Sequence, residues 1–143
     1  MRALIQRVKN ASVTISGKKI AEIQKGLLVL LGVKGGDTDE DAKYLVEKIV
    51  NLRIFEDEAG KMNLSLIDVK GELLIVSQFT LYADCRKGRR PSFTDAAAPE
   101  FANEMYKKFI QLARATGLKV AEGEFGAMMD ISLVNWGPVT IML

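Results

Sequence analysis

The sequence predicts a mixed α/β fold in a single domain, on three observations. The chain has 143 residues, enough for one domain with a real core but little more. Several segments alternate apolar and polar residues with a period of two, as half-buried strands do. Two other segments repeat apolar residues at a spacing of three to four, as helices with one buried face do. The order of these segments predicts β-β-β-α-β-β-β-α-β-β-β, with residues 1–143 in one domain.

The first predicted strands precede residue 34. Residues 2–8 and 12–17 alternate apolar and polar side chains, which indicates two half-buried strands. Residues 17–19 are predicted to turn the chain into a hairpin. Residues 26–33 (GLLVLLGV) are continuously apolar and few, which is typical of a strand buried on both faces.

Two helices are predicted, each with a recognisable start. Thr38 or Asp39 is suited to cap the first helix, and Pro99 is suited to the first turn of the second. Gly117 is the expected C-terminal cap of the second helix. The apolar face of the first helix comprises Ala42, Leu45, Val46, Ile49 and Leu52. That of the second comprises Phe101, Met105, Phe109, Leu112 and Ala113.

The remaining segments are predicted to be strands and one long loop. Residues 53–66 indicate a hairpin, and residues 71–84 carry the strongest strand signal in the middle of the chain. A polar loop is expected at 85–98. Residues 128–135 alternate again, and a final strand opens with Gly137-Pro138, although proline donates no hydrogen bond to a sheet.

The composition narrows the chemistry. The chain has no histidine, which excludes a Ser-His-Asp triad, a Cys-His dyad and zinc sites that need imidazole. Its single cysteine excludes an intramolecular disulfide and thiolate metal sites, so we expect no metal and no cofactor. No apolar run suits a signal peptide or a membrane span, and we expect a cytoplasmic protein that does not bind membranes.

Basic residues gather in one segment, although the net charge of the whole chain is only +2. Arg86, Lys87, Arg89 and Arg90 surround Gly88 within the predicted polar loop. A solvated loop and a local phosphate contact both explain such a cluster.

A group of polar residues interrupts the predicted strand at 71–84. Neighbouring side chains of a strand point to opposite faces, so Ser77 and Gln78 cannot both face solvent. An inward polar group needs a partner or a ligand. Exposure on alternate positions explains either residue alone, whereas a binding site explains both together with Thr80.

Two motifs together resemble a known family. SQFTL (residues 77–81) and NWGPVT (residues 135–140) are similar to the signature motifs of the D-aminoacyl-tRNA deacylases. The similarity covers the whole chain, through ALIQRV, GLLVLLGV, RIFEDEAGKMNLS, RPSF and GEFGAMMDISLVN. Trp136 departs from the family, whose members commonly have Asp there, while the intact first motif favours the D-specific branch over a paralogous animal deacylase. The resemblance implies a three-layer β/β/α domain with a barrel-like sheet and two helices.

The resemblance also implies roles for individual residues. The catalytic set would be Ser77, Gln78, Phe79 and Thr80. Phe125 and Met129, with Phe79, would line an adenosine pocket, and Arg7 and Asn135 would support the site. Gly137-Pro138 would be a cis peptide that enters the active site of the partner subunit in a homodimer. Arg86, Lys87, Arg89 and Arg90 would meet tRNA phosphates. From the residues alone, a trans Gly-Pro at an edge strand and a core position for the aromatics remain open.

The implied substrate is the ester of D-aminoacyl-tRNA, and two mechanisms are open. Thr80 would be a nucleophile only with a base beside it. Alternatively, N–H groups around Phe79 and Thr80 stabilise the oxyanion while the neighbouring 2′-hydroxyl of the RNA helps to activate water. We prefer the second because the chain has no histidine. A backbone filter that only excludes L side chains would also accept glycyl-tRNA. A catalytically silent RNA- or small-ligand-binding module and a general ester hydrolase are the competing hypotheses.

Overall fold

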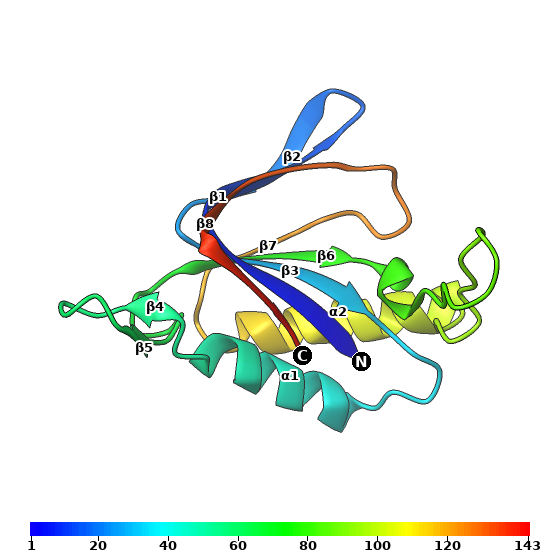
Figure 1. The fold of residues 1–143 in the computed structure, drawn as a ribbon, viewed down its shortest axis with the longest axis horizontal. Helices are drawn as coiled ribbons and strands as arrows, with labels where there is room; N and C mark the ends of the chain where they lie inside the picture. Colours follow the sequence, from blue (N-terminus) through cyan, green and yellow to red (C-terminus); the bar gives the residue numbers. More distant parts are fainter.

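A curved six-stranded sheet carries both helices on one of its faces (Figure 1). The computed structural model describes residues 1–143. The strands follow the order β2-β1-β3-β6-β7, with β8 added along β1. Their bounds are β1 (Arg2–Ile15), β2 (Lys18–Ile23), β3 (Gly26–Gly32), β6 (Glu72–Ser77), β7 (Val120–Glu122) and β8 (Asp130–Met142). Because β2 folds over toward β6 and β7, the sheet is barrel-like, and the predicted mixed α/β class is confirmed.

The two strands predicted at 2–8 and 12–17 form one strand, β1. Its first half pairs with β3 and its second half with β2, while β8 runs along both halves. Lys9 and Asn10 are exposed where β1 changes partners, so the alternation breaks although the strand continues. For the same reason the two strands predicted around Gly137-Pro138 are one strand, β8, interrupted by a bulge opposite Arg7.

Strands β3 and β6 are buried on both faces, as the apolar run at 26–33 predicts. Leu27, Val29 and Leu31 face the large core beneath the helices. Leu28 lies in a second, smaller core inside the curved sheet. The parallel pairing of β3 with β6 continues this arrangement into β6, whose alternate residues enter the two cores.

The helices pack side by side against the sheet (Figure 1). Helix α1 (Asp39–Asn51) begins at the predicted cap Thr38, whose hydroxyl accepts from the N–H of Asp41 in a reciprocal capping box. These hydrogen bonds hold the pKa of Asp41 below its ordinary value. The helix buries Ala42, Leu45, Val46, Ile49 and Val50, so Val50 replaces the predicted Leu52, which caps the end of the helix.

Helix α2 (Pro99–Arg114) begins at the predicted proline but ends earlier than predicted. Its C-terminal cap is Ala115, and Gly117 instead supplies a turn with φ +82° two residues later. The helix buries Ala102, Met105, Tyr106, Phe109, Ile110 and Ala113, whereas Phe101 and Leu112 are only half-buried. Neither helix is long and apolar enough to cross a bilayer.

The segment between the helices differs most from the prediction. The predicted hairpin exists as β4 (Phe55–Glu56) and β5 (Met62–Leu64). The strand predicted over 71–84 ends at Ser77, because its partner β3 ends at Gly32 and the last ladder bond joins the Gln78 N–H to the Leu31 carbonyl. The chain then forms η1, a 3₁₀ turn over Phe79–Tyr82, which places this motif at the end of the sheet.

Candidate functional site

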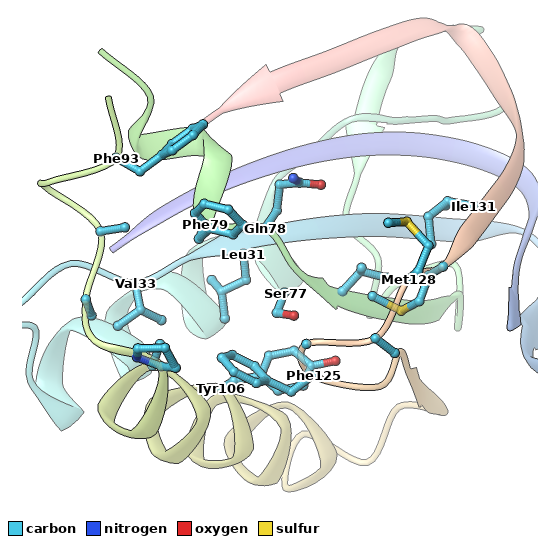
Figure 2. Close-up of a pocket in the computed structure, with 18 residues that line it drawn as sticks. Leu31, Val33, Ser77, Gln78, Phe79, Phe93, Tyr106, Phe125, Met128 and Ile131 are labelled. Atoms are coloured by element: carbon cyan, nitrogen blue, oxygen red, sulfur yellow. The ribbon is translucent and has the colours of Figure 1, made fainter. Parts of the chain in front are cut away.

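A cavity of about 760 Å³ lies where the ends of β3 and β6 meet the start of α2 (Figure 2). The segment that leads into β8 closes the opposite side. Most of the lining is apolar, with polar side chains only at the end of β6. Five of the predicted site residues line this cavity: Ser77, Gln78, Phe79, Phe125 and Met129.

The polar end of the cavity is the SQFT motif itself. Ser77 and Gln78 lie at the end of β6, with Ser77 on the side of Phe125 and Tyr106 (Figure 2). The side-chain amide of Gln78 donates a hydrogen bond to the hydroxyl of Thr80, which is exposed. No side chain caps the η1 turn, so the N–H groups of Phe79 and Thr80 at its start have no side-chain acceptor.

Two aromatic pairs shape the walls of the cavity. Phe79 is 56% exposed and meets Phe93 edge to face at a ring distance of 5.0 Å, so Phe79 is not a core residue. Phe125 is half-buried and lies 6.0 Å from the ring of Tyr106. Met129 is also half-buried and packs on the smaller core. Phe125 and Met129 therefore contribute to the core and to the cavity wall at once.

Tyr106 is a cavity residue that the sequence analysis missed. Its hydroxyl donates to the carbonyls of Ile75 (2.8 Å) and Gly123 (3.1 Å), which ties α2 to β6 and to the end of β7. Burial of this hydroxyl raises the pKa of Tyr106 above its ordinary value. The signal was present, because position 106 lies one turn after Ala102 on the buried face of the predicted helix.

Gly137 and Pro138 do not line this cavity. In the pairing of β8 with β1, Val8 faces Asn135 and Gln6 faces Thr140, so residues 136–139 bulge outward opposite Arg7. The Gly137-Pro138 peptide is cis, and both residues are exposed.

The predicted supporting residues fasten the base of the bulge. The side chain of Asn135 closes it, accepting from the N–H of Val139 at 2.8 Å and donating to the hydroxyl of Thr140 at 3.1 Å. Arg7 is only 2% exposed. It donates from Nε to the carbonyl of Trp136 at 2.8 Å and from Nη1 to the carbonyl of Ile54.

The predicted basic cluster is less uniform than its sequence suggests. Arg86 forms a two-point contact with Asp84, at 2.8 Å and 2.6 Å, and this holds the pKa of Asp84 below its ordinary value. Lys87, Arg89 and Arg90 are exposed and have no acidic partner. Three of the four predicted cations are therefore free to meet an external anion.

An apolar cavity with aromatic walls and a few polar groups at one end is typical of sites for small or nucleotide-like ligands. The sequence model of the family described as D-Tyr-tRNA(Tyr) deacylase matches residues 4–143, and the chain belongs to this family. A protein of Thermosipho africanus named D-aminoacyl-tRNA deacylase is 63% identical over 100% of this chain and 96% of its own length. These findings confirm the predicted family and the predicted class of enzyme, a hydrolase.

Two solved structures share the fold. A structure described as c-Myc DNA unwinding element binding protein is 44% identical, with a TM-score of 0.94 over 100% of this chain and 97% of that chain. A probable eukaryotic D-amino acid tRNA deacylase has a TM-score of 0.86 at 20% identity, over 99% of this chain and 97% of that chain. At that identity the second comparison shows the common fold alone.

Proposed function

We propose that the protein hydrolyses the ester bond of D-aminoacyl-tRNA, releases free tRNA and the amino acid, and spares L-aminoacyl-tRNA. It would thereby serve translation quality control in the cytoplasm. The observation that carries the proposal is the cavity that collects Ser77, Gln78, Phe79, Phe125 and Met129 at the end of β6. Membership of the deacylase family supports the reaction.

The terminal adenosine of tRNA fits the apolar part of this cavity. Aromatic and thioether side chains provide a stacking surface for an unpaired base, and Phe125 and Met129 occupy facing parts of the lining (Figure 2). With the base there, the ester would lie near Gln78 and Thr80. The sugar and the ester would then be oriented by the polar end of the cavity.

The active site would be completed by a second copy of the chain. Gly137 and Pro138 are exposed and lie outside the cavity of their own chain, so they are free to enter that of a partner. In a homodimer with the site at the subunit interface, their backbone would face the α-carbon of the substrate. Glycine lets a backbone approach a ligand closely because it has no side chain.

A backbone wall is the kind of filter that the proposed selectivity requires. Sparing L esters by roughly 10⁴-fold needs about 5.5 kcal/mol. Packing differences in an apolar pocket supply only about 1–3 kcal/mol per methylene. Steric exclusion by fixed backbone atoms can supply the larger value. Such a wall rejects an L side chain but has no means to reject glycine, so glycyl-tRNA would also be a substrate.

The function is tested by comparing three esters with the purified protein. We expect fast deacylation of D-tyrosyl-tRNA and of glycyl-tRNA, with L-tyrosyl-tRNA left intact. Attack on both tyrosyl enantiomers would contradict the filter and indicate a general ester hydrolase. Loss of neither would leave only the silent binding module. Resistance of glycyl-tRNA alone would contradict exclusion as the basis of selectivity.

The geometry favours water attack assisted by the RNA over a threonine nucleophile. The only side-chain partner of the Thr80 hydroxyl is Gln78, whose amide cannot accept a proton at neutral pH. The N–H groups of Phe79 and Thr80 would stabilise the oxyanion, and the neighbouring 2′-hydroxyl of the ribose would help to activate water. Gln78 and Ser77 would then act by orienting the ester and the ribose.

Replacing Thr80 with valine distinguishes the two mechanisms. Valine keeps the shape of the side chain and removes the hydroxyl, while the backbone N–H stays in place. We expect the kcat on D-tyrosyl-tRNA to fall by less than about tenfold, since loss of a true nucleophile costs several orders of magnitude. Thr94→Val, an exposed threonine outside the cavity, is the control. A fall of three or more orders of magnitude in Thr80→Val alone would establish the nucleophile.

The free cations of the loop would contact the phosphates of the tRNA acceptor stem. We expect the double replacement Arg89→Ala and Arg90→Ala to raise the KM for D-tyrosyl-tRNA and to lower its salt dependence by about one unit per lost contact. Arg86→Ala is the matched control, because Asp84 already neutralises that guanidinium. Equal effects of the double variant and the control would contradict a specific phosphate contact.

A further inference from the structure

Trp136 is the only tryptophan of the chain and directly precedes Gly137. Its ring is half-buried and lies 6.5 Å from the ring of Phe55. Two cations approach the same ring, the guanidinium of Arg7 at 4.7 Å and the ammonium of Lys25 at 5.2 Å. A residue that merely joined two parts of an exposed bulge would not need these contacts.

Arg7 therefore touches residue 136 in two ways. Its Nε donates to the Trp136 carbonyl at 2.8 Å, and its guanidinium plane is stacked on the indole. The remaining contacts hold the far end of the guanidinium, through the carbonyl of Ile54 and the carboxylate of Glu56 at 3.9 Å. Together these contacts fix the guanidinium in position and in orientation.

The guanidinium also lies directly against Gly137. A Cβ built on Gly137 would be 3.1 Å from Nη2 of Arg7, so the two groups are in contact across the base of the bulge. Any rotation of the guanidinium toward solvent would change the support on which Gly137 and Pro138 rest. The indole is the group that blocks this rotation, because cations bind the face of an aromatic ring.

We propose that Trp136 is a specificity-determining positioning residue, whose indole holds Arg7 and through it the Gly137-Pro138 backbone in the arrangement that excludes L-aminoacyl esters. This inference rests on the proposed function and deepens it. It also assigns a role to the position at which the chain departs from its family, where Asp is the common residue.

The test compares kcat/KM on D-tyrosyl-tRNA and L-tyrosyl-tRNA for the full-length protein and its Trp136→Ala variant. We expect the ratio of the two values to fall by about tenfold, which corresponds to about 1.4 kcal/mol. Most of the change should be faster attack on the L ester, with the D ester affected by less than about threefold. Trp136→Phe retains an aromatic face for Arg7 and should restore most of the ratio.

The controls separate positioning from folding. Trp136 also packs on the large core, and a merely structural role would slow both esters by the same factor and leave the ratio unchanged. That result would overturn the inference. Lys25→Ala removes the other cation from the ring without touching Arg7, so it should leave the ratio unchanged; a loss equal to that of Trp136→Ala would also overturn the role assigned to Arg7.

The fluorescence of the single tryptophan gives a measurement that needs no variant. A non-hydrolysable D-alanyl amide of 3′-amino-3′-deoxyadenosine should change the emission of Trp136 as it saturates the site. An unchanged emission at concentrations that inhibit hydrolysis would count against the inference. If the wild-type protein attacks neither ester or both, the proposed function fails, and this inference with it. If the wild type is selective and Trp136→Ala is equally selective, the inference alone fails.

Discussion

Replacing Gly137 with alanine is expected to lower kcat/KM on D-tyrosyl-tRNA by about 100-fold, because even a misplacement of about 1 Å in a site can have that effect. A Cβ at this position would lie 2.7 Å from Cγ2 of Val139 and 3.0 Å from its backbone nitrogen. The backbone here also has φ +141°, which L side chains rarely adopt. The bulge must therefore shift, and the proposed wall of the partner's site shifts with it. Steady-state kinetics on both tyrosyl enantiomers measure the effect.

Gly60→Ala is the matched control for this prediction. Gly60 also has a positive φ, +72°, but no atom lies within 4 Å of a Cβ built there. It sits in the turn between β4 and β5, so the variant carries a similar backbone penalty without a steric clash. We expect its kinetics to match the wild type. Wild-type kinetics in Gly137→Ala, with the fold intact by circular dichroism, would contradict a role for the bulge.

Replacing Arg7 with methionine is expected to lower the free energy of unfolding by about 3 kcal/mol, because two carbonyl oxygens lose their donor at about 1–3 kcal/mol each. These are the carbonyls of Ile54, which is buried, and of Trp136, which is partly buried. The long ion pair with Glu56, whose side chain is 46% exposed, adds little. Urea unfolding measures the change, and the D-to-L ratio should fall as well.

Arg2→Met is the control for Arg7→Met, because Arg2 makes the same kinds of contact at the surface. Arg2 donates to the carbonyl of Leu81 at 2.8 Å and stacks on Tyr82 at 4.5 Å, but it is exposed. Water can replace its contacts, so we expect a loss below about 1 kcal/mol. Similar losses in the two variants would show that burial of Arg7 does not set its contribution.

Local patterns predicted the helices and the most buried strands well. The capping chemistry of Thr38 and the proline at the start of α2 were readable because each depends on backbone groups within one turn. The apolar run of β3 was readable because both faces of that strand are covered. Strand ends were less readable. Whether residues 78–84 continue β6 depends on where β3 ends, which is a property of another segment.

The site shows the same division. The SQFT motif, Phe125 and Met129 could be named from the sequence because they resemble a family's motifs. That Arg86 is paired with Asp84, or that Tyr106 ties α2 to two strands, depends on contacts that no periodicity encodes. Trp136 was visible only as a departure. Its neighbours Arg7, Lys25 and Phe55 come from distant parts of the chain.

By itself the sequence determined the class of fold, the family, the absence of histidine chemistry and most of the residues at the polar end of the cavity. These follow from periodicity, composition and short motifs, all of which are local. Only the tertiary structure decided that Gly137 and Pro138 lie outside the cavity and that Arg7, Ile54 and Trp136 form one cluster. The physical reason is that the pairing of β1 with β8, and the packing of β4 beneath them, join residues more than 40 positions apart.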